Sequence, residues 1–64
     1  MTGDEFRAAR LALGLATQQI AADRLEVDVR TVGRWERGDI AVPGPVKVAL
    51  RLMRQLAAKL RRGG

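Results

Sequence analysis

Hydrophobic residues recur at steps of three and four along most of the chain, which is the spacing of an amphipathic α-helix. The pattern predicts four helices, at residues 2–13, 17–25, 29–37 and 45–60. No segment shows the alternation that is typical of a strand. We therefore expect an all-α chain with a single domain at residues 1–62 and a short tail at residues 63–64.

Residues at the ends of these segments support the predicted boundaries. Thr2 and Glu5 have the spacing of a capping box, in which each side chain binds the backbone N–H of the other residue. Asp28 can cap the third helix by accepting a hydrogen bond from its first turn, and Gly38 is a good terminator. Pro45 suits the first position of the fourth helix, where a backbone N–H would have no partner.

The fourth predicted helix carries more apolar surface than one small core can cover. Its later apolar positions are Met53, Leu56, Ala57 and Leu60. An apolar stripe left over in so small a chain is more often a dimer surface than a lipid surface. We expect residues 45–60 to be the dimerisation element. The alternatives are that the stripe only completes the core, or that it binds a membrane or another partner.

The composition favours a polyanionic partner. The 64 residues include 12 Lys and Arg against 7 Asp and Glu, a formal net charge of +5, and neither Cys nor His. Nucleic acid is the first expected partner and anionic lipid the second, while the usual zinc-finger ligands are excluded. With one Phe and one Trp, the chain lacks the aromatic platforms that bind single strands. A chain this small gains stability from a partner subunit, so we expect a homodimer.

Nothing in the sequence indicates an enzyme or a membrane protein. The carboxylates form no paired arrangement and there is no Gly-rich phosphate loop, so we expect no catalysis, cofactor, metal or small-molecule effector. No apolar run approaches the roughly 20 residues that span a bilayer, and no signal-peptide pattern occurs. We expect a cytoplasmic protein that binds no membrane.

The stretch at residues 18–38 is the most informative part of the chain. It predicts two short helices joined by a tight connection, with three arginines on the outward face of the second: Arg30, Arg34 and Arg37. Two short helices that cross steeply, the second with basic side chains near its start, can place a helix in a DNA major groove.

Three motifs carry a family resemblance: Phe6-Arg7 with Arg10, Gly14-Leu15, and Arg30-Thr31-Val32-x-Arg34-Trp35-Glu36-x-Gly38. With them the chain resembles the lambda-repressor-like helix-turn-helix family, the Cro-like or XRE-like regulators of phages and bacteria. The resemblance covers roughly residues 4–53 and is most specific at TVGRWERG. It implies a compact helix-turn-helix domain of four helices, or five. In size and layout the chain is also similar to small phage autoregulators, including anti-CRISPR-associated ones.

The resemblance implies base-reading residues on the third helix: Val29, Arg30, Gly33 and Arg34. Arg30 and Arg34 lie one turn apart, and each can donate two hydrogen bonds to O6 and N7 of guanine. Val29 can contact a thymine methyl group. Gly33 would let the helix backbone approach the DNA closely.

The resemblance implies structural roles for three residues, and the chain departs from the family in two ways. Trp35 is expected in the core, where it would fasten the third helix to the first. The family also implies an ion pair between Arg10 and Glu36, because a partly buried charge needs a partner. The chain departs from the family by one extra residue between Gly14 and Val27, which leaves two registers of the second helix open. It also lacks the turn glycine of the family and has Leu25-Glu26 instead.

The expected phosphate contacts depend on the register of the second helix. They are Thr31 and Arg37, with Thr17 or Gln18 at the start of that helix. In one register Thr17 takes the place of the family's phosphate-binding glutamine and Ile20 is buried. In the other, Gln18 takes that place and Ile20 is pushed toward solvent. We favour the first register, because exposing Ile20 forfeits burial worth roughly 1.5–3 kcal/mol.

These observations together predict a sequence-specific regulator of transcription that binds double-stranded DNA. We expect a repressor that binds an inverted-repeat operator as a homodimer, through the helix at residues 28–37. The alternative is an antitoxin-like interaction module that binds a partner protein through its C-terminal helix, and DNA secondarily.

Overall fold

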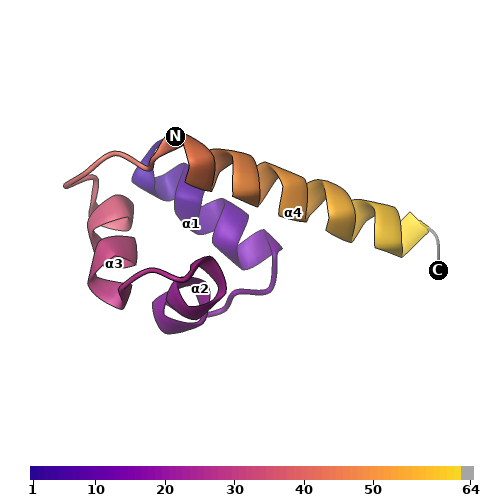
Figure 1. The fold of residues 1–64 in the computed structure, drawn as a ribbon, viewed down its shortest axis with the longest axis horizontal. Helices are drawn as coiled ribbons and strands as arrows, with labels where there is room; N and C mark the ends of the chain where they lie inside the picture. Colours follow the sequence, from indigo (N-terminus) through magenta and orange to yellow (C-terminus); the bar gives the residue numbers. More distant parts are fainter. Residues whose placement is uncertain (63–64) are drawn as a thin grey trace.

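Helices account for most of the residues in the computed structural model, which describes residues 1–62 (Figure 1). They are α1 (Gly3–Ala12), α2 (Gln18–Leu25), α3 (Val29–Arg37) and α4 (Gly44–Arg62). The predicted all-α class is confirmed, since the described residues form four helices and no strand. The observed bounds differ from the predicted ones most at the end of α4, which continues past residue 60. The tail expected at residues 63–64 lies outside the described residues.

The predicted caps are present at the ends of α1 and α3. The Thr2 hydroxyl accepts a hydrogen bond from the Glu5 backbone N–H at 3.1 Å, and the Glu5 carboxylate accepts one from the Thr2 N–H at 2.7 Å. Donation from the Thr2 backbone, aided by its side chain, lowers the pKa of the Glu5 carboxyl below its ordinary value. Asp28 accepts from the Arg30 N–H at 2.8 Å, and Gly38 ends α3 at a left-handed φ of 79°.

The core lies where α1 meets α3 and α4. Its buried hydrophobic residues come from all four helices and two loops: Phe6, Ala9, Leu15, Ala21, Ala22, Val32, Trp35, Val42 and Leu50. α1 packs against both α3 and α4, and α2 packs against α3. The rings of Phe6 and Trp35 meet edge to face, with their centroids 5.4 Å apart. Trp35 therefore fastens α3 to α1, as predicted.

The start of α1 presses directly against the end of α3 at Gly3. A Cβ atom at this position would overlap the backbone carbonyl oxygens of Trp35 and Glu36. Because both obstacles are backbone atoms rather than flexible side-chain ends, only glycine fits without moving a helix. Gly3 thus sets the distance between the two helices.

α4 is long enough to extend past the rest of the domain (Figure 1). It has 19 residues, which correspond to about 28 Å of helix, and the molecule measures 38 × 19 × 18 Å. Its first half contributes Leu50 to the core and packs Val46 and Met53 against it. Within residues 1–62, no helix combines the length and the apolar character that crossing a membrane requires.

Candidate nucleic-acid interface

The connection between α2 and α3 is short and closed by backbone hydrogen bonds. The N–H groups of Glu26 and Val27 donate to the carbonyl oxygens of Asp23 and Ala22, at 3.3 and 3.0 Å. Glu26 adopts a left-handed conformation with φ of 57°. This conformation costs a residue with a Cβ roughly 1–2 kcal/mol, whereas glycine adopts it freely. A strained glutamate thus occupies the turn position at which the helix-turn-helix family that the chain resembles has glycine.

The favoured register of α2 is wrong, because Ile20 faces solvent. Ile20 is 45% exposed, whereas Ala21 and Ala22 are fully buried. These two small side chains face the core and let α2 pack closely. The alanines therefore occupy the buried side of α2 that was expected to hold Ile20. Thr17 caps α2 by accepting a hydrogen bond from the Ile20 N–H at 3.1 Å. Gln18 is the first helical residue, as the alternative register requires.

A polar network ties the helix pair α2–α3 to α1. Arg10 donates to the Glu36 carboxylate at 2.8 Å and to the carbonyl oxygen of Leu15, also at 2.8 Å. Gln18 donates to the other Glu36 oxygen at 3.3 Å. The side chains of Arg10 and Glu36 are only 6% and 9% exposed, so the predicted ion pair is confirmed. Each buried charge has partners, and the start of α2 and the end of α3 are held in one arrangement.

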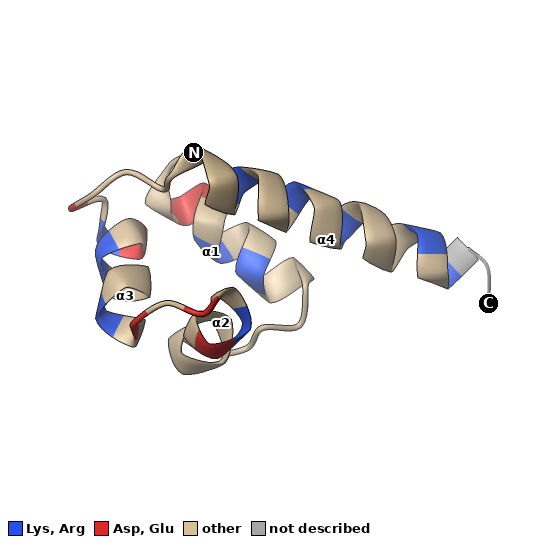
Figure 2. Cartoon of the chain, in the orientation of Figure 1, with Lys and Arg blue, Asp and Glu red and all other residues tan. Residues whose placement is uncertain are grey.

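The outer face of α3 carries exposed guanidinium groups. The side chain of Arg30 is 86% exposed and Arg34 is exposed as well, one turn further along the same face. Arg30 lies 4.0 Å from the Asp28 carboxylate, and Arg37 pairs with Asp39 at 3.0 Å. Exposed ion pairs of this kind contribute little and exchange easily with another anion. Figure 2 shows basic positions along the outer edge of α3, whereas acidic positions gather around α2 and its connection.

The remaining predicted α3 residues are less accessible. Val29 packs against the core and Thr31 is half-buried. Gly33 is buried, and a Cβ there would lie 3.2 Å from Nη1 of Arg37 and 3.5 Å from Oε1 of Gln18. Gly33 therefore leaves room for these two side chains to close over α3, and its backbone is not open to the close approach expected from the sequence.

The outer face of α3 has the chemistry to bind anions. Its exposed functional groups are guanidinium donors, which match phosphate oxygens and the acceptor edge of guanine. Within residues 1–62, no group of three or more His, Cys, Asp or Glu side chains is placed to hold a metal ion.

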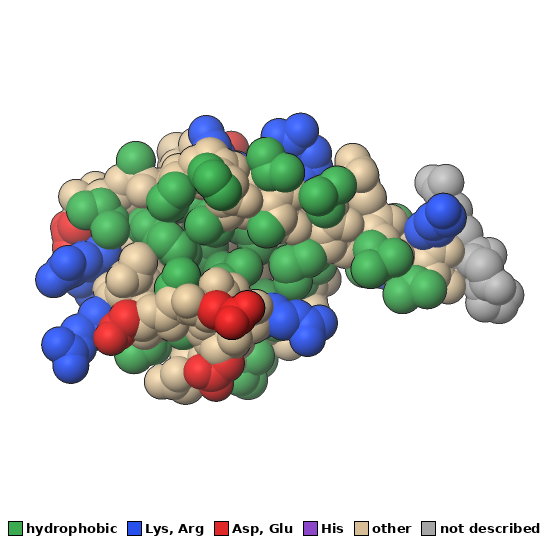
Figure 3. Space-filling view, viewed as in Figure 1, with side chains coloured by type: hydrophobic (Ala, Val, Ile, Leu, Met, Phe, Trp, Pro, Cys, Tyr) green, Lys and Arg blue, Asp and Glu red, His purple; other side chains and the backbone are tan. Residues whose placement is uncertain are grey.

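The predicted dimer residues fall on two different faces of α4. Leu56 and Leu60 are 57% and 68% exposed, whereas Met53 packs against the core and Ala57 is half-buried. The sequence prediction was therefore wrong in placing Met53 with the exposed residues. Two further exposed residues precede them at four-residue spacing. We call this set the aliphatic stripe: Val48, Leu52, Leu56 and Leu60. Hydrophobic side chains continue onto the part of α4 that extends past the body (Figure 3).

Comparisons with known protein families, with curated proteins and with solved structures found no match.

Proposed function

We propose that the chain is a lambda-repressor-like helix-turn-helix regulator that binds specific double-stranded DNA as a homodimer and represses transcription. The observation that carries this proposal is the pair Arg30 and Arg34. They are exposed one turn apart on a short helix whose other face is fixed in the core. The net charge of +5 supports a polyanionic partner.

In the proposed complex, α3 lies in the major groove. Arg30 and Arg34 each donate two hydrogen bonds to a guanine. The exposed part of Val29, which is half-buried, meets a thymine methyl group at the start of the helix. Such a bidentate contact discriminates between bases only if the helix cannot rotate away. The buried ion pair between Arg10 of α1 and Glu36 of α3 supports the proposal, because it restrains the rotation of α3.

The observed register of α2 decides which of its first residues we propose as a phosphate contact. The Thr17 hydroxyl already caps the helix, whereas Gln18 has a second amide N–H free for phosphate while Glu36 holds the first. Arg37 leaves its exposed partner Asp39 for a phosphate oxygen, and Thr31 adds a hydroxyl. We therefore propose Gln18, Thr31 and Arg37 as the phosphate contacts.

The homodimer forms through the aliphatic stripe. Four exposed aliphatic side chains on one helix face are more apolar surface than a small chain usually leaves in water. A twofold pair places two α3 helices on one side of a duplex, so the operator is an inverted repeat with half-sites about 34–36 Å apart, or a multiple of that distance.

The test begins with the selection of bound sites from a random duplex pool, followed by affinity measurements on selected and random duplexes. Arg34→Ala should weaken binding to the selected duplex by about 1–3 kcal/mol and relax the preference at one base position. Arg51→Ala on α4 removes the same charge away from α3 and serves as the control, with affinity close to that of the parent chain. An equal loss for Arg34→Ala on random duplex would exclude base reading, and absence of any selected site would end the proposal.

A further inference from the structure

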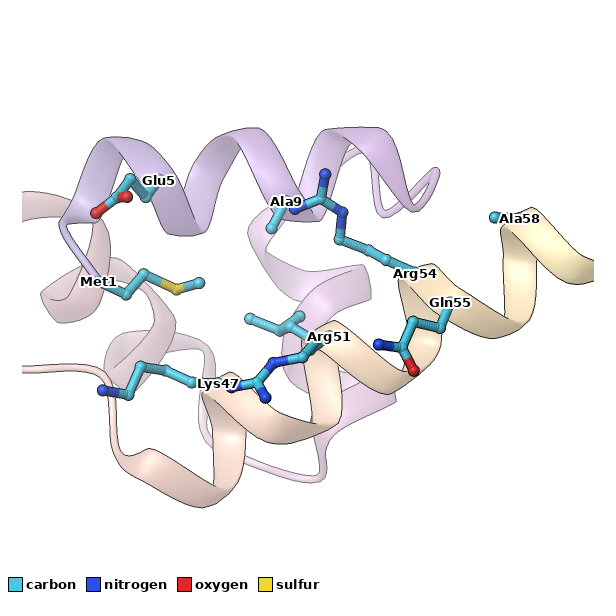
Figure 4. A pocket seen from close by; sticks show the side chains of 9 residues that line it. Met1, Glu5, Ala9, Lys47, Arg51, Arg54, Gln55 and Ala58 are labelled. Atoms are coloured by element: carbon cyan, nitrogen blue, oxygen red, sulfur yellow. The ribbon is translucent and has the colours of Figure 1, made fainter.

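A groove lies between α1 and α4, on a different part of the molecule from the exposed arginines of α3. Its volume is about 620 Å³, and it runs from Met1 at one end to Ala58 at the other (Figure 4). The exposed apolar side chains of its floor are Met1 and Ala58, at its two ends, whereas Ala9 and Leu50 lie buried beneath it. The span from Lys47 to Ala58 along α4 corresponds to about 16 Å, or three helical turns.

Cationic side chains line the α4 side of the groove. Lys47, Arg51 and Arg54 are spaced by four and then three residues, so they succeed one another one turn apart along the groove. α4 contains no acidic residue, and none of the three forms an ion pair with a carboxylate among residues 1–62. The proposed DNA contacts do not use these charges.

One carboxylate faces them from α1. Glu5 lies on the opposite wall near Met1 and Lys47 (Figure 4). Its carboxylate accepts a hydrogen bond from the Thr2 N–H, which lowers the pKa of the carboxyl. The groove therefore has one negative end and a positive side over an apolar floor.

We propose that this groove binds an acidic amphipathic helix of a partner protein. The apolar face of the bound helix covers Met1, Ala58 and the methylene stems of the basic side chains. Its carboxylates, one turn apart, pair with Lys47, Arg51 and Arg54. A helix in a groove is a common mode of peptide recognition, and its side chains have the same turn spacing as the three cations. At the end of the bound helix that lies beside Glu5, a residue with a positive charge is favoured.

Two other classes of ligand fit the groove less well. A nucleic acid backbone has no apolar surface to cover the floor, and Glu5 repels phosphate. A small ligand is expected in a cavity that encloses most of its surface, whereas this groove is open along three turns of α4. The inference does not depend on DNA binding by α3, and the two sites can be occupied together.

The test uses a fluorescent synthetic helix with leucines on one face, glutamates one turn apart beside them, and a lysine at one end. We expect it to bind the full chain with a roughly micromolar Kd that rises with salt. A matched peptide with lysine in place of every glutamate should not bind. The variant Arg51→Glu with Arg54→Glu should weaken binding by about tenfold or more. Ala58→Glu, an exposed site at the end of the groove, should weaken it as well.

Arg34→Glu on α3 is the control and should leave peptide affinity unchanged, while it abolishes specific duplex binding. The inference is overturned if the glutamate peptide does not bind, or if the α3 control weakens peptide binding as much as the groove variant. It is also overturned if duplex DNA displaces the peptide, or if the groove variant changes the oligomeric mass of the chain. Retention of specific duplex binding by Arg34→Glu would contradict the proposed function and not the groove.

Discussion

The outer face of α3 and the aliphatic stripe of α4 are both exposed surfaces of single helices, yet they differ in what lies behind them. α3 has nine residues, is capped by Asp28 and Gly38, and holds Val32 and Trp35 in the core. α4 is twice as long, and its second half has large aliphatic side chains in water. Guanidinium groups are stable in water, whereas a row of leucines is stabilised when it is covered. The outer face of α3 therefore needs no cover, whereas the aliphatic stripe would gain stability from the second chain proposed above.

The largest expected effect concerns the support of α3. Arg10→Met should reduce the free energy of unfolding by about 3–5 kcal/mol, because Glu36 would keep a buried charge without its partner. The measurement is urea unfolding followed by the fluorescence of Trp35, which is the only tryptophan. The double variant Arg10→Met with Glu36→Met removes both charges and should recover much of the loss. A single variant as stable as the parent would show that α3 is held by packing alone.

Gly3→Ala should have the next largest effect on stability. The added methyl group would meet backbone atoms at the end of α3, so one helix must shift, at a cost of about 1–3 kcal/mol. Gly33→Ala is the matched control. Its methyl group meets only the movable ends of Arg37 and Gln18, and alanine gains helix propensity. Thermal unfolding of the two variants should separate them, and an equal change in both would contradict the close approach at Gly3.

The sequence was sufficient where structure depends on residues close together in the chain. The capping box at Thr2 and Glu5, the cap at Asp28 and the stop at Gly38 all act within a few positions. The exposure of the arginines on α3 follows from helical spacing once the opposite face is buried. These features were predicted within one or two residues of their observed places.

Features that depend on how helices meet could not be predicted in the same way. Hydrophobicity favoured burial of Ile20, but the adjacent Ala21 and Ala22 occupy the side of α2 that faces the core. Nothing in the sequence around Gly3 indicates that glycine is required there. The requirement comes from the backbone carbonyl groups at the end of α3, which lie against it in the folded chain. On α4, the apolar pattern is wide, and only the position of α1 decides that Met53 faces the body while Leu52 faces solvent.

Disruption of the aliphatic stripe tests whether this face of α4 is covered by a second chain. Leu56→Asp should convert the proposed dimer to monomers in solution, because a charge replaces an aliphatic side chain whose burial contributes roughly 1.5–3 kcal/mol. The monomer should stay folded, since this side chain is 57% exposed. Gln55→Asp, one residue away, adds the same charge outside the stripe and should leave the mass unchanged. Mass measured by light scattering decides the question, and a Leu56→Asp chain with the parent's mass would remove the proposed interface.

The smallest expected effect is a gain in stability at the connection between α2 and α3. Glu26→Gly should raise the free energy of unfolding by about 0.5–1 kcal/mol, since relief of the left-handed strain outweighs the added freedom of the unfolded chain. Glu26→Ala removes the same carboxylate while it keeps the strain, and should change stability little. The comparison of the two by urea unfolding separates backbone strain from charge. If alanine stabilises as much as glycine, the side chain of Glu26 rather than its backbone would be the unfavourable element, and the turn would not be strained.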